Sequence, residues 1–133
     1  MSEELREILA RQITPEFVIL QEGPISTSDS EPEPDLVVAR GVRSDFRYVH
    51  PSTAELVVEV AVTSLEIDRV KALIYAEAGV KEYWIVCPEA KQVEVYRQPG
   101  PQGYGERSVI ASPAVLECAV LPGVRVDLAA LFA

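Results

Sequence analysis

The stretch that decides the fold is residues 55–86, ELVVEVAVTSLEIDRVKALIYAEAGVKEYWIV, which predicts a strand, a helix and a second strand. The first strand is almost wholly apolar at both alternating sets of positions, which is typical of a strand covered on both faces. Thr63 and Glu66 form the T-x-x-E pattern of a capping box, and Gly79 is suited to ending a helix. We therefore expect the main helix at about residues 65–78, packed across one face of a sheet.

The other patterns of the chain add a helix near each end and further strands. Residues 3–12 predict an amphipathic N-terminal helix with Ser2 as its N-cap, and LAALFA at 128–133 predicts a short closing helix. Apolar or alternating runs predict strands at 17–21, 35–40, 55–62, 82–87, 92–97, 107–111, 115–120 and 124–126, with a Pro/Gly loop at 98–105. Without a repeat or a linker, we expect a single domain over residues 1–133. Its fold class is α+β (α/β-like), with one mixed central sheet.

The composition excludes several classes of protein. A hydrophobic content of 48% and a charged content of 25% are ordinary for a globular chain and argue against disorder. The absence of a long apolar run predicts no membrane span. Cys87 and Cys118 lie far apart and His50 is the single histidine, so we expect two reduced, buried thiols in a cytoplasmic protein and no zinc site. The net charge of −9 argues against a broad nucleic-acid-binding surface but not against a local cleft that holds metal ions.

Two acids and one lysine are the candidate functional residues. Glu59 stands in the middle of the apolar central strand, where a carboxylate is costly unless something pairs with it or binds it. Asp35 begins the preceding strand, so the two carboxylates converge at one end of the sheet if the strands are neighbours. Carboxylate oxygens of this kind suit Mg²⁺ or Mn²⁺. Lys71, in the second turn of the main helix, can reach the pair and orient or deprotonate a water for attack on a phosphodiester.

These residues lie in motifs that resemble a known family. The segments EPEPDLVV, ELVVEVAVTSL and IDRVKALIYAEAGVKEYWIV are similar to those of the Uma-two-type putative restriction endonucleases, of the PD-(D/E)XK nuclease superfamily. The resemblance extends from about Ser2 to the last residue, and it implies a restriction-endonuclease-like fold. Family members usually carry a further N-terminal segment, which this sequence is expected to lack.

The resemblance also implies an activity, namely metal-dependent hydrolysis of DNA by an endonuclease. Pro34-Asp35 corresponds to the P-D motif and Glu59 to the acid of E-x-K. The lysine position of E-x-K is Ala61, so the resemblance implies that its role has moved to Lys71. The expected catalytic residues are thus Asp35, Glu59 and Lys71, with Asp35 and Glu59 holding Mg²⁺ (or Mn²⁺). One divalent ion shared by both requires their carboxylates to lie within roughly 4 to 6 Å of each other.

Each of these residues also has a plain structural interpretation. Asp35 follows a proline, where aspartate commonly starts a strand; Glu59 could be a buried acid paired with a base; and Lys71 could be a solvated lysine in an i,i+3 pair. Asp68, the partner in that pair, is expected to be structural. Plain structural or surface positions are also expected for Gln21, His50, Tyr83, Trp84, Glu3 and Glu4.

A second hypothesis is an interaction module that keeps the nuclease fold without strong catalysis and acts as a homo-oligomer. The net charge of −9 favours it, as does Val62, which stands where close relatives often carry an aspartate. A sheet that lacks the expected N-terminal segment leaves strand edges unpaired, so we expect a homodimer or a larger homo-oligomer. Its candidate contacts are Phe17, Val18 and residues 128–133.

Overall fold

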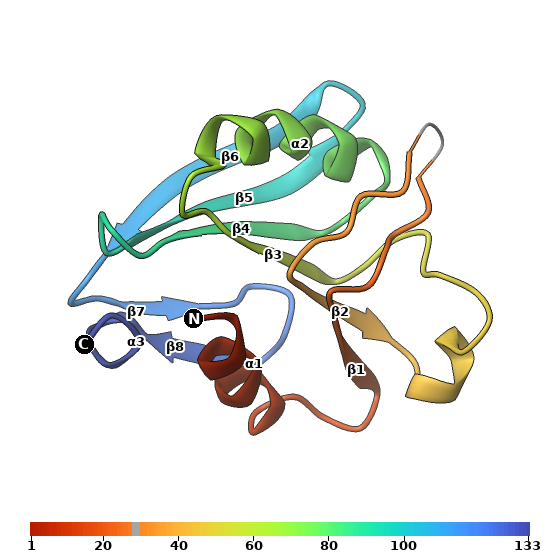
Figure 1. The fold of residues 1–133 in the computed structure, drawn as a ribbon, viewed down its shortest axis with the longest axis horizontal. Helices are drawn as coiled ribbons and strands as arrows, with labels where there is room; N and C mark the ends of the chain where they lie inside the picture. Colours follow the sequence, from red (N-terminus) through yellow and green to blue (C-terminus); the bar gives the residue numbers. More distant parts are fainter. Residues whose placement is uncertain (28–29) are drawn as a thin grey trace.

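A six-stranded mixed sheet forms the centre of the computed structural model, which describes residues 1–27 and 30–133 (Figure 1). The strands follow the order of the chain, and every neighbouring pair is antiparallel except β3 and β4, which are parallel. Their bounds are β1 (Phe17–Gln21), β2 (Leu36–Arg40), β3 (Leu56–Val60), β4 (Glu82–Cys87), β5 (Gln92–Gly100) and β6 (Gly103–Ala111). A parallel pair needs a crossover connection, and helix α2 (Leu65–Glu77) supplies it at the position expected from the sequence.

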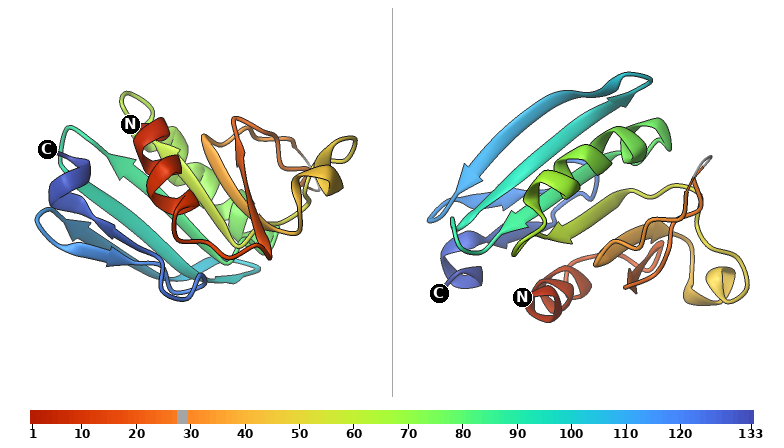
Figure 2. Two further views of the ribbon diagram at one scale, coloured as in Figure 1. Left: turned by 90° about the horizontal axis from the view of Figure 1, so that it is seen from below. Right: turned by 45° about the horizontal axis from the view of Figure 1, so that its top comes forward.

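The two faces of the sheet are covered by different elements (Figure 2). Helix α2 packs on one face, where Val57, Tyr75 and Tyr83 belong to one buried cluster. The other face is covered by α1 (Ser2–Ala10), by a two-stranded ribbon of β7 (Val115–Glu117) and β8 (Arg125–Asp127), and by α3 (Leu128–Leu131). Because both faces are covered, β3 and β4 are buried along almost their whole length.

The start and the end of α2 differ in how well they were predicted. Ser64, rather than Thr63, holds the N-cap position and makes no side-chain capping bond, so the expected capping box is wrong. The Ser64 hydroxyl instead donates to the carboxylate of Asp68 at 2.7 Å. Gly79 follows the helix with a φ of +80°, as expected for a residue that ends it. In the N-terminal helix α1, the expected N-cap is also wrong, because Ser2 lies inside the helix and Met1 holds the N-cap position.

Several predicted strands and one loop have different bounds, and strands β5 and β6 both extend into the predicted loop. Strand β3 ends at Val60 because the chain then turns toward α2, leaving Val62 74% exposed. The expected loop at 98–105 is the tip of the β5–β6 hairpin. Beyond Arg97, β5 pairs only with β6 and no longer with β4, so Pro99 is tolerated at this edge. The residues expected as strands at 115–120 and 124–126 form the separate ribbon β7–β8 instead of joining the central sheet.

Other expectations concern burial. Cys87 and Cys118 are both free and buried, and burial raises the pKa of the Cys118 thiol to about 12. In the described residues, no helix is both long and apolar enough to cross a membrane. Three residues expected as contacts between subunits, Val18, Leu131 and Phe132, are instead buried in the core of the chain.

Candidate active site

Glu59 is a buried carboxylate on the face of the sheet that α2 covers. It lies on β3 directly opposite Ile85 of β4, and its side chain is 6% exposed. Oε2 accepts hydrogen bonds from the hydroxyl of Tyr75 at 3.0 Å and from Nζ of Lys71 at 3.2 Å. Burial raises the pKa of Glu59, and the nearby ammonium of Lys71 offsets this only in part. Glu59 is therefore an acid whose charge is held in place by two donors from one helix.

Helix α2 brings three functional groups to Glu59 from one face. Asp68, Lys71 and Tyr75 are spaced by three and four residues, which places them one above the other along the helix. Nζ of Lys71 lies 3.6 Å from Oδ1 of Asp68, so the ammonium is between two carboxylates. Burial lowers the pKa of Lys71, but the charges and hydrogen bonds of Glu59 and Asp68 outweigh it and raise the pKa. The side chain therefore remains an ammonium at neutral pH.

Asp68 is more deeply buried than a surface helix acid. It is 2% exposed, and its carboxylate accepts from the Ser64 hydroxyl as well as facing Lys71. Its backbone carbonyl accepts a hydrogen bond from the hydroxyl of Tyr83 at 2.8 Å. The structural pair expected for Asp68 and Lys71 is present, and the same lysine also contacts Glu59.

Asp35 lies beside these groups but makes a different contact. It directly precedes β2, and Leu36 is opposite Val58, so continuing the register places Asp35 opposite Glu59. Oδ2 of Asp35 accepts a hydrogen bond from the N–H of Val60 at 2.6 Å, which ties the start of β2 to the end of β3. Within the described parts of the chain, Asp35 forms no ion pair with Lys71. The expected carboxylate separation stays a prediction.

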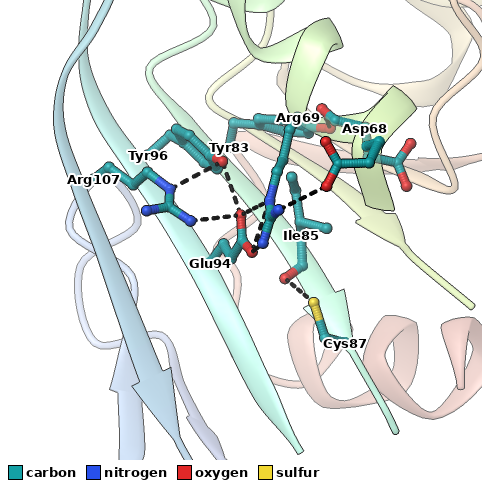
Figure 3. Close-up of polar contacts among 9 residues, drawn as sticks. Asp68, Arg69, Tyr83, Ile85, Cys87, Glu94, Tyr96 and Arg107 are labelled. Atoms are coloured by element: carbon teal, nitrogen blue, oxygen red, sulfur yellow. Dashed lines mark hydrogen bonds and ion pairs between the residues drawn. The ribbon is translucent and has the colours of Figure 1, made fainter. Parts of the chain in front are cut away.

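A second buried acid on the same face was not identified from the sequence. Glu94, with a side chain that is 0% exposed, lies on β5 and receives Arg69 of α2 through Nε and Nη2, the shortest contact being 2.6 Å (Figure 3). It also accepts from the hydroxyl of Tyr96 at 2.9 Å and faces Arg107 of β6 at 3.3 Å. Burial would raise the pKa of Glu94, but the hydrogen bonds from Arg69, Tyr96 and Arg107 hold it below the ordinary value. The sequence shows Glu94 only as an acid in an alternating strand, a pattern that does not by itself indicate a buried carboxylate.

A third buried acid lies on the opposite face and has a structural role. Oε2 of Glu82 accepts from Nε1 of Trp84 at 2.6 Å, and Oε1 accepts from the N–H of Ala119 at 3.0 Å. Arg97 completes the group at 3.4 Å from Oε2. Glu82 thus links the central sheet to the segment between β7 and β8, and Trp84 is a core residue, as expected.

The remaining candidates lie away from Glu59. Gln21 donates to Glu3 of α1 at 3.3 Å, so both belong to the opposite side of the fold. Glu4 pairs with the N-terminal ammonium, and His50 lies 3.8 Å from Glu31 with nearly half of its side chain exposed. None of these contacts involves the candidate active site.

The donor set limits which metal the site suits. Over residues 1–27 and 30–133, no cluster of three or more His, Cys, Asp or Glu side chains converges as a full protein ligand set would. Mg²⁺ is commonly held by only one or two carboxylates together with waters and substrate oxygens. Glu59 and Asp35 could supply the two carboxylates of such a magnesium-type site, with waters and substrate as the other ligands.

Comparison with known proteins assigns the fold and the family of the chain. The fold is similar to the crystal structure of a putative nuclease of the DUF820 group from Anabaena variabilis, with a TM-score of 0.79 and 17% sequence identity. The match covers 98% of this chain and 77% of that one, and it defines a nuclease-like fold. The family model Uma2, described as putative restriction endonuclease, matches residues 2–129. The chain belongs to this family, as the sequence motifs indicated. No curated protein matches it.

Proposed function

We propose that the protein is a metal-dependent DNA endonuclease of the PD-(D/E)XK type. The observation that carries the proposal is the buried Glu59 carboxylate, with the Lys71 ammonium 3.2 Å away, at the end of the central strand. A buried carboxylate paired with a partly exposed lysine is an arrangement in which pKa values are shifted, as they often are at active sites. Membership of a family described as restriction endonucleases supports DNA as the substrate.

Glu59 and Asp35 would hold Mg²⁺ or Mn²⁺ in this proposal. Asp35 keeps a second carboxylate oxygen besides the one that accepts from Val60. A bound divalent ion supplies Lewis-acid polarisation of the phosphoryl oxygens and a more acidic water. Tyr75 holds Glu59 in one rotamer through its hydroxyl, so the carboxylate needs little rearrangement to act as a ligand.

In this proposal Lys71 orients the attacking water or a phosphoryl oxygen and does not act as a general base. Without a bound metal ion its raised pKa keeps the proton on Nζ at neutral pH, which favours a donor role over accepting a proton from water. It can donate hydrogen bonds to the attacking water or to a phosphoryl oxygen, where a fixed positive charge stabilises the developing negative charge. Asp68 keeps the ammonium in place when Glu59 has another partner.

Cleavage of supercoiled plasmid DNA with Mg²⁺ or Mn²⁺ tests the proposal. We expect nicking by the parent protein and a loss of about 100-fold or more for Lys71→Ala. Lys81→Ala is the matched control, because Lys81 pairs with Glu55 and lies outside the site. It should retain the parent rate. A parent without metal-dependent cleavage, or equal rates for Lys71→Ala and the control, would contradict the proposal.

A second candidate function is a homo-oligomeric interaction module in the cytoplasm. One observation favours it: α2 presents an exposed apolar stripe of Ile67, Val70 and Leu73, which are 63%, 71% and 52% exposed. Large apolar groups gathered on one helix face often mark a contact surface. Light scattering of the parent and of Val70→Lys tests it: a dimer that dissociates in the variant supports this function, and a strict monomeric parent rejects it.

A further inference from the structure

Two arginines on the α2 face form a rigid cationic site that the proposed catalytic chemistry does not use. Arg69 comes from α2 and Arg107 from β6, and both reach the same carboxylate, Glu94, from opposite sides (Figure 3). Their side chains are 36% and 50% exposed, whereas Glu94 is fully buried. The carboxylate is therefore hidden beneath the two guanidinium groups, which face outward.

Glu94, the buried acid of this cluster, does not balance the charge of both arginines. Glu94 neutralises one of the two arginines, and its oxygens already accept from Arg69, Arg107 and Tyr96. The second nearby acid, Glu66, meets Nη1 of Arg69 but is 86% exposed, so this contact is weak and easily exchanged. Among the described residues, Nη1 of Arg107 has no hydrogen-bond or ion-pair partner. If the exposed Glu66 is not counted, one positive charge is left to face solvent in a protein whose net charge is −9.

The guanidinium groups are fixed before any ligand arrives. Arg69 is held by a two-pronged contact with Glu94, and Arg107 is held by that acid and by the hydroxyl of Tyr96, to which its Nε donates at 3.3 Å. The Arg107 guanidinium also lies over the Tyr96 ring, 5.8 Å from its centre. An arginine fixed in this way loses little side-chain entropy on binding an anion, and its planar fork suits phosphate.

The cluster lies in line with the candidate active site. Glu59, Ile85 and Glu94 are directly opposite one another on β3, β4 and β5, so the two acids share one face. Neighbouring strands lie about 4.8 Å apart, which puts the two positions roughly 10 Å apart. About three nucleotides, at a rise of 3.4 Å each, cover this distance.

We infer that Arg69 and Arg107 bind a backbone phosphate of the nucleic acid whose cleavage takes place at Glu59 and Lys71. The inference rests on the proposed function, because it takes nucleic acid as the substrate. The contact is to phosphate and carries no base specificity. Glu94 is the positioning residue that holds both arginines for this contact.

Fluorescence anisotropy with a labelled DNA duplex in EDTA tests the inference apart from cleavage. Arg107→Gln keeps the Arg69–Glu94 contact and should weaken binding about tenfold. Between about 50 and 200 mM salt, it should also reduce the slope of log K against log salt by about one. Arg107→Lys, which keeps the charge, should restore most of the slope. Arg125→Gln is the matched control, since Arg125 lies on β8 and pairs with the exposed Glu117.

The possible results separate the two proposals. A parent that does not bind DNA, or an Arg107→Gln variant that binds like Arg125→Gln, overturns the phosphate site. Reduced binding by Arg107→Gln in a protein that does not cleave DNA supports the phosphate site and rejects the nuclease. Thermal unfolding of each variant shows whether a loss of binding reflects a loss of fold, and Arg107→Lys supplies the second measurement if Arg107→Gln unfolds.

Discussion

Replacing Glu59 by Gln should make the protein more stable at neutral pH, which is the opposite of what losing a structural ion pair would do. The Glu59 carboxylate is 6% exposed, and burial raises its pKa. Removing the Glu59 charge does not leave the Lys71 ammonium unpaired, because Asp68 remains 3.6 Å from Nζ and more than a quarter of the lysine side chain is exposed. Tyr75 can still donate to the amide oxygen. Replacing buried charges by neutral groups is worth about 1 to 4 kcal/mol, and we expect about 1 kcal/mol because Lys71 already compensates part of the burial.

The sign of the pH dependence follows from the raised pKa. A carboxyl whose folded pKa lies above its unfolded value of 4.5 favours the folded state at low pH, and this contribution is lost as pH rises through the folded pKa. The stability advantage of Glu59→Gln should therefore be small below pH 4.5 and grow toward pH 7. Urea unfolding followed by the fluorescence of Trp84, the single and fully buried tryptophan, measures it at each pH.

Glu94→Gln is the matched comparison, with the opposite expected sign. Glu94 is also a buried strand acid, but its hydrogen bonds to Arg69 and its other donors hold its pKa below the ordinary value. Its contribution to stability is present above pH 4.5 and is lost as pH falls, so Glu94→Gln should cost about 3 kcal/mol at pH 7 and less at low pH. Destabilisation by Glu59→Gln at pH 7, or a difference from the parent that does not change with pH, would refute the reasoning.

Three further changes test the local contacts. Lys71→Met leaves Glu59 with Tyr75 as its remaining donor, so it should lower the free energy of unfolding in urea by about 2 to 3 kcal/mol at pH 7 and by less at pH 4.5. An equal loss at the two pH values would contradict the Lys71–Glu59 pair. Tyr75→Phe should cost about 1.5 kcal/mol by the same assay, and a neutral effect would show that its hydroxyl does not support Glu59. Gly79→Ala should cost about 1 kcal/mol through backbone strain alone at φ +80°, since the added methyl meets nothing closer than 3.6 Å; unchanged thermal unfolding would exclude that strain.

The parts of the fold that local patterns determine were predictable from the sequence. The bounds of β1 and β4 agree with the expected 17–21 and 82–87, because each apolar run is followed by residues that break a strand. Helix α2 and the parallel pair that it connects follow from the apolar run of β3 and from Gly79. The placement of Glu59 against Lys71 follows in turn, because a crossover helix packs back on its own strand.

Features that depend on distant partners were not predictable in the same way. Glu94 lies in an alternating strand and Glu82 begins an apolar one, and neither pattern indicates a buried acid. Their burial comes from α2 on one face and the β7–β8 connection on the other. The ribbon β7–β8 leaves the central sheet because its apolar residues Leu116 and Val126 cover the face opposite α2, which no local pattern indicates. The Asp35 contact is likewise set by the register of β2 on β3.

Calorimetric titration with Mn²⁺ tests the central claim most directly, because it measures the metal site without requiring cleavage. The parent protein should bind the ion, Lys71→Ala should retain binding, and Glu59→Gln should lose it while remaining folded. Asp35→Asn should weaken binding, since one of the two expected carboxylate ligands becomes an amide. Equal binding by the parent and Glu59→Gln would mean that Glu59 is a structural acid and would contradict the nuclease account at its centre.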